Sequence, residues 1–472
     1  MVCDLAQPEQ TQAIRSAIGQ KRRNRGGTGD IGMWERLHTT LASSRLEIRT
    51  ERKYGGARWL VLCMTASGMR RQVTWRGSVD RLMCRQPALL LLPILSLLGP
   101  SSARAQETVS DVVGFLMTNQ GVLTADFERD RAAAQAASDA LVRALLVNLT
   151  TVPIATSSSG FLYRFNPELG TVERATDGFG GFFVERALTP GHGRASFGIS
   201  ASSSAFNRLD GQSLDDGRFV TTANRFADEP ESFDTDRLTL RVRSSTVTAF
   251  ASVGITDRLE IGGAVPFVEL MLEGERVNVY RGQTGLQASG TATARGMADA
   301  AVRAKYTVVS GGRGAAAIAA ELRLPTGDAE NLLGAGSAGF RLMGIGALER
   351  GSIMVSGNAA LVRGGLSDEV TFGGAAALAL HPRVSVTTEV LARHIAELRP
   401  LELWAQPHPT YQGVQTVRLR GGEPGRTVAA GIAGVKWNPA GTLVLGAHLR
   451  WNFTDTGLTA PLTPALAFEY GF

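Results

Sequence analysis

The stretch PLTPALAFEYGF (residues 461–472) ends the chain. It places four apolar side chains two residues apart: Leu466, Phe468, Tyr470 and Phe472. Successive side chains of a β-strand point to opposite faces, so these four share one face, while Glu469 lies on the other. The pattern predicts a strand that separates an apolar environment from a polar one.

The same period of two recurs through the chain from about residue 193 onward. Twelve segments show it, and most are 11–14 residues long, which is long for a soluble protein and suits a tilted membrane crossing. They cover residues 193–206, 237–253, 258–271, 297–309, 314–325, 337–349, 352–363, 370–380, 383–395, 426–437, 442–454 and 461–472. In the sixth to eighth segments Gly and Ala fill both faces, so the alternation there is weak. The fold class is predicted to be all-β.

The connections between these segments alternate in length. Short links such as Gly254–Asp257 and Ser310–Arg313 contain turn-forming residues, and longer links such as 207–236 and 396–425 lie between them. This alternation is expected of a closed antiparallel barrel in an outer membrane, with short periplasmic turns and longer external loops. Residues 156–472 are therefore predicted to form a transmembrane antiparallel β-barrel of about twelve strands, preceded by a short helical segment.

The alternation also predicts which charged side chains face the interior of the barrel. Charged groups on an inner face need water or a partner of opposite charge. The positive side chains assigned to the lumen are Arg241, Arg243, Arg303, Lys305, Arg323, Arg393 and Arg450. The negative ones are Glu260, Glu321, Glu389 and Glu469. An open pore with this slight positive excess would prefer anions weakly; the alternative is that these groups pair and brace the wall.

The aromatic series Phe468, Tyr470 and Phe472 resembles the signal read by the outer-membrane assembly machinery. The edge strand of an unfinished barrel must be recognised and inserted before closure, because an open edge is prohibitive in lipid. The resemblance implies a protein of the bacterial outer membrane, with lipid and the assembly machinery as its partners.

An export signal precedes the body of the chain. Residues 83–105 contain a cationic start, the apolar run ALLLLPILSLL, a helix breaker and the sequence Ala103-Arg104-Ala105, which is the order of a cleaved signal peptide. The apolar run is too short to cross a bilayer, which takes roughly 20 residues. The mature chain is expected to begin at Gln106 or Glu107.

Residues 1–82 are polar and Arg-rich. They are expected to be an over-extended start or a disordered leader, with Met69 or Met83 as the true start. Lys and Arg number 17 against 7 Asp and Glu in residues 1–105, but 32 against 36 in residues 106–472. The body therefore gives no electrostatic reason to expect nucleic-acid binding. All three Cys precede residue 105, which excludes disulfides and Cys–zinc sites from the body.

Residues 106–155 show helical rather than strand periodicity. Val109, Val112, Val113, Leu116 and Met117 recur at helical spacing. A second set with the same kind of spacing follows within 126–149: Ala133, Ala137, Ala140, Leu141, Ala144 and Leu145. Two amphipathic helices are predicted, as a periplasmic cap, as a barrel plug or simply as a pair lying against another element.

Two segments resemble a known family. The stretch from Gly254 to Phe267 (GITDRLEIGGAVPF) is similar to a hairpin of the outer-membrane proteins named for the meta-pathway of phenol degradation. LPTGD (324–328) followed by LLGAG (332–336) is similar to a later loop of that family. The resemblance covers about residues 240–472 and implies a barrel that transports hydrophobic or aromatic compounds. It carries over no functional residues.

These observations favour a channel or transporter for small solutes. Two alternatives stay open. One is a structural or surface-interaction barrel with a blocked lumen, and the other, less favoured, is an outer-membrane lipid hydrolase. A hydrolase would need a Ser beside a His on a lipid-facing rim, whereas His448 is assigned to the lumen. Neither a nucleotide motif in the right context nor metal-ligand spacing of His occurs. No enzyme activity, cofactor or metal is expected.

Overall fold

The structure is a computed structural model. It describes residues 107–118, 127–150, 160, 162–166, 171–174, 178–311 and 314–472, and for 127–130, 163–166 and 171–174 only the backbone. The expected leader (1–82) and signal peptide (83–105) lie outside the described residues. So do parts of the helical segment predicted for 106–155.

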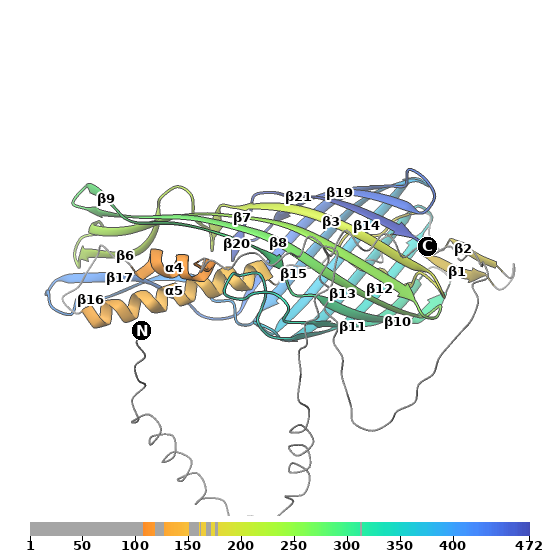
Figure 1. Ribbon diagram of the computed structural model, residues 1–472, viewed down its shortest axis with the longest axis horizontal. Helices are drawn as coiled ribbons and strands as arrows, with labels where there is room; N and C mark the ends of the chain where they lie inside the picture. The colour runs from red at the N-terminus through yellow and green to blue at the C-terminus, as the bar shows by residue number, and fades with distance from the viewer. Residues whose placement is uncertain are drawn as a thin grey trace, which may run out of the picture. The chain divides into compact units, whose positions relative to one another are not determined.

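Within the described residues, twelve antiparallel strands form a closed ring (Figure 1). They are β3 (Ala195–Phe206), β7 (Ser232–Gly254), β8 (Leu259–Tyr280), β10 (Ala301–Gly311), β11 (Gly314–Arg323), β12 (Gly339–Arg350), β13 (Ile353–Gly364), β14 (Glu369–His381), β15 (Val384–Ile395), β18 (Arg426–Trp437), β19 (Leu443–Asn452) and β21 (Thr463–Gly471). The ring closes where β21 pairs with β3, with Phe468 opposite Ile199. The predicted barrel is confirmed, including the Gly- and Ala-rich strands β12 to β14.

The outer face of the barrel is apolar around the whole ring. Every strand exposes at least one large apolar side chain on its outward positions: Ile199, Val247, Ile261, Tyr306, Ile318, Leu342, Leu361, Phe372, Val390, Val435, Leu449 and Leu466. Soluble monomers rarely expose continuous apolar surface of more than a few hundred Å². The outer face therefore suits an apolar solvent.

Strands β7 and β8 continue well past the barrel. Their outer parts pair with each other, β8 pairs with β9 (Gln283–Met297), and β7 pairs with β6 (Phe219–Phe226). Strands β17 (Val414–Gly421) and β16 (Leu401–Pro407) complete this extended sheet at one end of the barrel (Figure 1).

The sequence-based assignment of 207–236 and 396–425 as plain connections is therefore wrong, and residues 273–296, between two predicted strands, also form strand. The barrel strands were identified by apolar side chains on their outward faces, and the extended sheet shows the opposite pattern. Its apolar side chains, such as Leu240 and Leu272, face inward and are buried, while Glu273 and Glu275 face outward. A search for apolar outward faces overlooks such strands.

Two helices lie on the inner face of the extended sheet: α4 (Val109–Thr118) and α5 (Phe127–Thr150). Figure 1 shows them between β7–β9 on one side and β16–β17 on the other. Both predicted helices are present. Neither they nor any other helix in the described part of the chain is long and apolar enough to cross a membrane.

Helix α4 packs into a shallow seat formed by two glycines. Gly274 and Gly290 stand opposite each other on β8 and β9. A Cβ at Gly290 would lie 3.0 Å from Cγ1 of Val112, and one at Gly274 would collide with Leu116. The missing side chains let the helix approach the sheet closely and bury its apolar face.

Minor elements complete the fold. β4 (Arg208–Leu209), β5 (Gln212–Ser213) and β20 (Leu458–Thr459) form a small sheet, and β1 (Tyr163–Asn166) pairs with β2 (Thr171–Arg174).

Asp210 links three segments that connect barrel strands: its own, between β3 and β7, one between β15 and β18, and one between β19 and β21. Its carboxylate accepts hydrogen bonds from the backbone N–H groups of Leu401 (2.9 Å) and Gly457 (2.8 Å). Burial raises the pKa of this carboxyl group above its usual value. The extended sheet is thus tied to the barrel through one side chain as well as through β7 and β8.

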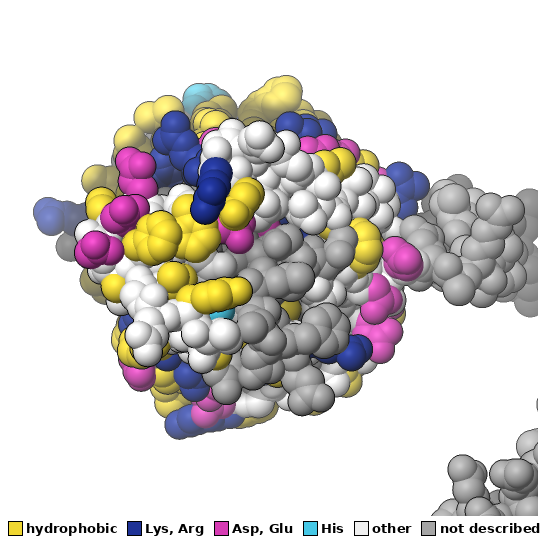
Figure 2. Space-filling view, turned by 90° about the vertical axis from the view of Figure 1, so that its left-hand side faces the viewer, with side chains coloured by type: hydrophobic (Ala, Val, Ile, Leu, Met, Phe, Trp, Pro, Cys, Tyr) yellow, Lys and Arg dark blue, Asp and Glu magenta, His cyan; other side chains and the backbone are white. Residues whose placement is uncertain are grey.

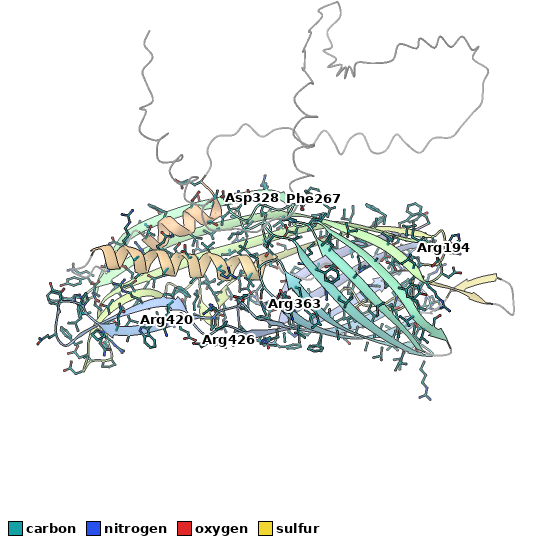
Figure 3. The ribbon with its side chains drawn as sticks, turned by 90° about the horizontal axis from the view of Figure 1, so that it is seen from below. Arg194, Phe267, Asp328, Arg363, Arg420 and Arg426 are labelled. Carbon is teal, nitrogen blue, oxygen red and sulfur yellow. The ribbon has the colours of Figure 1, made fainter. Side chains whose placement is uncertain are left out.

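The two ends of the barrel differ. One end carries the extended sheet and the helices, and the other carries tight turns such as Gly351-Ser352. Arg194, directly before β3, lies at the tight-turn end, whereas Arg420 lies in the extended sheet and Arg363 and Arg426 between them (Figure 3). The C-terminus also lies at the tight-turn end (Figure 1).

Candidate lumen and plug segment

Residues Gly178–Arg194, which we call the plug segment, lie inside the barrel except at their end, where His192 and Gly193 are exposed beside the turn between β7 and β8. They contain no helix or strand. Phe179, Phe182, Glu185 and Arg186 are nevertheless at most 3% exposed. They are buried because inward side chains of the barrel strands surround them.

The wall holds the backbone of the plug segment from several strands. Lys436 Nζ on β18 donates to the carbonyl of Gly181 at 2.6 Å. On β10, Lys305 Nζ donates to the carbonyl of Arg186 at 3.3 Å, and Thr307 Oγ1 donates to that of Ala187 at 2.7 Å. These strands lie far apart in the ring, so the segment crosses the interior rather than following one side.

Glu389 on β15 is the main acceptor for the plug segment. Its carboxylate accepts backbone N–H groups of Phe182, of Phe183 (2.9 Å) and of Val184 (2.8 Å). The side chain is 3% exposed, and hydrogen bonds to a buried charge contribute about 1.5–3 kcal/mol each. Three successive N–H groups around one carboxylate fix the position of the segment.

Phe182 fills a pocket in the wall. Gly434 on β18 and Gly446 on β19 leave room for its ring: a Cβ at Gly446 would lie 2.8 Å from Cε1 of Phe182. The ring lies 4.2 Å from that of His448, and Lys436 Nζ sits 4.4 Å from its centroid. The pocket therefore combines shape, an aromatic contact and a cation–π contact.

A small apolar cluster covers the other side of the plug segment. Ala187 is fully buried against Met343 and Ile345 of β12, with Ala317 and Ala319 of β11. These inward side chains would meet water in an empty lumen. The plug segment shields them, which adds a hydrophobic contribution to its docking.

The lumenal charges form a connected network. Arg303 pairs with Glu185 of the plug segment and with Glu260 (3.3 Å), and Lys305 pairs with Glu260 at 2.8 Å. Separate pairs join Arg323 to Glu321 (3.4 Å) and Arg393 to Glu369 (3.2 Å).

Most residues assigned to the lumen from the sequence do face inward. These are Glu260, Arg303, Lys305, Glu321, Arg323, Glu389, Arg393, Arg450 and Glu469. Arg450 forms no ion pair with any residue that the structure describes. Glu469 lies close to Gly160, where a Cβ would collide with its carboxylate.

Arg241 and Arg243 lie on the opposite face of β7, and their assignment to the lumen needs correction. The side chain of Arg241 is 64% exposed and pairs with Glu273 at 3.9 Å. The inward neighbours Leu240 and Val242 are buried in the core that the helices share with the extended sheet. Because the helices pack on the inner face here, apolar side chains point inward and charged ones outward, which is the reverse of the expected pattern.

Six further charged groups belong to the interior and were not assigned to it from the sequence: Glu185, Arg186, Asp299, Arg341, Glu369 and Lys436. Strict alternation along β18 would have found Lys436, and along β14 it would have found Glu369. Glu185 lies in the plug segment, where no strand period exists. No signal in a single sequence marks it as lumenal.

Cavities remain beside the plug segment, at the end toward the helices. Two of about 110 Å³ each are formed by the described residues. The first is lined by apolar groups such as Phe183, Phe250 and Met343 together with four arginines: Arg303, Arg323, Arg341 and Arg393. Serines and threonines of β3 and β7 line the second, together with Arg450. Both touch Thr150, Phe183 and Arg323, so the two cavities adjoin.

The aromatic residues of the last strand face outward. Phe468, Tyr470 and Phe472 are 39%, 41% and 72% exposed. The rings of Tyr470 and Phe472 touch edge to face at 5.0 Å. The three residues thus form one accessible aromatic edge beside the seam between β21 and β3.

No family model matches the chain, and no curated protein does. Among solved structures, the COG4313 outer membrane channel from Pseudomonas putida F1 is similar, with 11% identity and a TM-score of 0.39 over 61% of this chain and 98% of that one. The beta domain of the Bordetella autotransporter Brka shares 10% identity at a TM-score of 0.30, covering 60% of this chain and 100% of that one. OprB of Pseudomonas putida shares 9% identity at a TM-score of 0.24, covering 59% of this chain and 93% of that one.

Proposed function

We propose that this protein is an outer-membrane channel for small solutes, narrowed by its own plug segment. The observation that carries the proposal is the closed ring of twelve strands with an apolar outer face and a charged inner wall. Outer-membrane barrels combine these two faces, since lipid lies outside and water inside. The aromatic edge at Phe472 supports delivery by the outer-membrane assembly machinery.

The cavities support small solutes. Each is somewhat smaller than the roughly 150 Å³ of an apolar protein cavity that holds benzene. Apolar groups such as Phe183 and Met343 lie beside several arginines in the first cavity. This lining favours small, partly apolar solutes that carry negative charge, in keeping with the hydrophobic or aromatic compounds implied by the family resemblance.

The arrangement of charges supports a weak preference for anions. Most lumenal arginines have a carboxylate partner, which cancels much of their field. Arg450 has none among the described residues and lines the second cavity. Unbalanced positive charge in a narrow, poorly solvated space biases permeant ions.

A second candidate function is a structural or surface barrel with a blocked lumen. The observation that favours it is the number of hydrogen bonds between the plug segment and β10, β15 and β18. A lipid hydrolase finds less support. His448 faces inward, where it packs against Phe182 and Phe183 rather than toward a lipid-facing rim.

Planar-bilayer recording of the purified protein under a salt gradient tests the proposal. We expect a small conductance with a reversal potential that indicates anion selectivity. Arg450→Glu should shift this reversal potential toward the value for cation selectivity. Repeating both measurements with Phe182→Ala, which loosens the plug segment, keeps the test informative when the wild-type current is very small. Cation selectivity of the wild type would contradict the assignment of Arg450. Absence of current in both backgrounds would favour the blocked barrel.

A further inference from the structure

The chain between α5 and β3 connects opposite ends of the barrel. Helix α5 ends at Thr150, at the end that carries the extended sheet. Strand β3 starts at the other end, where the N–H of Phe472 donates to the carbonyl of Ala195 and the N–H of Gly193 to that of Gly254. Figure 1 shows the helices and the C-terminus at these opposite ends.

Most of the described residues between these two points lie inside the barrel, while the β1–β2 hairpin lies beyond its tight-turn end (Figure 1). Arg323 Nη1, from the inner wall, donates to the carbonyl of Thr150 at 3.3 Å. Gly160 is buried, its carbonyl accepts from Arg186, and it adjoins Glu469 of β21. The plug segment, which follows β2 along the chain, lies inside the barrel again. A route along the outside would place polar backbone against an apolar face, which is prohibitive in lipid.

The end that carries the helices has the surface of a part that lies in water. Figure 2, which views this end, shows Lys, Arg, Asp and Glu side chains distributed among hydrophobic ones. Ion pairs on the extended sheet, such as Arg295–Glu269 and Arg241–Glu273, have side chains that are mostly 40–70% exposed. Mixed charge of this kind is typical of water-exposed surfaces.

We propose that the helical segment 109–150 is displayed on the cell surface, joined to the barrel through its own lumen. The inference rests on the proposed outer-membrane location and adds which end of the barrel faces the cell exterior. Barrels of this kind place tight turns and the end of the last strand in the periplasm and longer connections outside. The helices pack on the long-connection side. The N-terminal part of the body is thus a surface domain with the extended sheet, rather than a periplasmic cap.

Single cysteines test this topology, because residues 106–472 contain no Cys. The reagent is a membrane-impermeant maleimide applied to intact cells and to cells with a permeabilised outer membrane. The reporter is Ala136→Cys, exposed on α5, with Ala137→Cys as its matched control because that position is only 5% exposed. Thr284→Cys marks the extended sheet and Ser352→Cys a tight turn, both at exposed positions. The wild-type chain is the blank.

We expect Ala136→Cys and Thr284→Cys to react in intact cells, and Ser352→Cys only after permeabilisation. Reaction of Thr284→Cys but not of Ala136→Cys in intact cells would place the helices in the periplasm and overturn the inference, leaving the outer-membrane location intact. Reaction of Ser352→Cys alone would reverse the orientation and overturn it as well. If the protein is missing from the outer-membrane fraction, the proposed function itself fails and the inference falls with it.

Discussion

Replacing Phe182 with alanine should release the plug segment without unfolding the barrel. The ring is 3% exposed in its pocket between Gly434 and Gly446. Removing a buried Phe side chain typically costs about 3–5 kcal/mol. The strands keep their own ladders of hydrogen bonds, so this cost falls on docking of the segment.

The expected size of the effect follows from that free energy. Because about 1.4 kcal/mol corresponds to a factor of ten, the ratio of undocked to docked plug segment should rise about a hundredfold to a few thousandfold. In planar bilayers the variant should open far more often than the wild type. Gly446→Ala should act in the same direction from the wall side, since its new Cβ would lie 2.8 Å from the ring.

Two controls isolate this effect. Phe372→Ala removes the same atoms from an outward position that is 57% exposed, and Gly374→Ala adds a methyl group where nothing lies within 4 Å. Both should record like the wild type. If Phe182→Ala folds into the usual heat-modifiable form and its currents match the wild type, the plug segment does not control the lumen.

Two other substitutions test separate parts of the fold. Gly290→Val should displace α4 from its seat at a cost of about 1–3 kcal/mol for overpacking, which should be seen as faster proteolysis near residue 118. The control Gly285→Val, whose Cβ would meet only Gln287 at 3.8 Å, should leave the rate of proteolysis unchanged. Equal rates of proteolysis for the two variants would count against the seat. Phe472→Asp should reduce the assembled form and leave precursor in the periplasm, because it removes the end of the aromatic edge. Leu462→Asp, at a 47% exposed position before β21, should assemble normally, and normal assembly of Phe472→Asp would argue against the edge as a signal.

The barrel itself could be predicted from the sequence because lipid imposes a strict period. Outward positions must be apolar on every strand, so Leu466, Phe468 and Tyr470 reveal their strand without any alignment. The same rule worked for β10 and β19. It also assigned most of the inward charges, since their positions follow from the parity of the strand.

The rule fails where lipid no longer decides the environment. Beyond the barrel, helix α4 covers the inner face of β7 and β8, so Leu240 and Val242 point inward and Arg241 and Arg243 outward. The plug segment has no period at all, because each of its residues meets a different strand. Contacts such as Glu389 with the N–H groups of residues 182–184 depend on the closed ring, and a sequence read strand by strand does not contain them.

An engineered disulfide between plug and wall tests the central claim most directly. A Cβ at Gly178 would lie 3.5 Å from that of Ala379 on the inward face of β14, within the range of about 3.5–4.5 Å found in disulfides. In protein isolated from the outer membrane, Gly178→Cys with Ala379→Cys should yield a cross-linked peptide pair that reduction separates. Gly178→Cys with Leu380→Cys, whose second site points outward and is 62% exposed, should not. Free thiols at 178 and 379 in the folded barrel would contradict a lumen occupied by the plug segment.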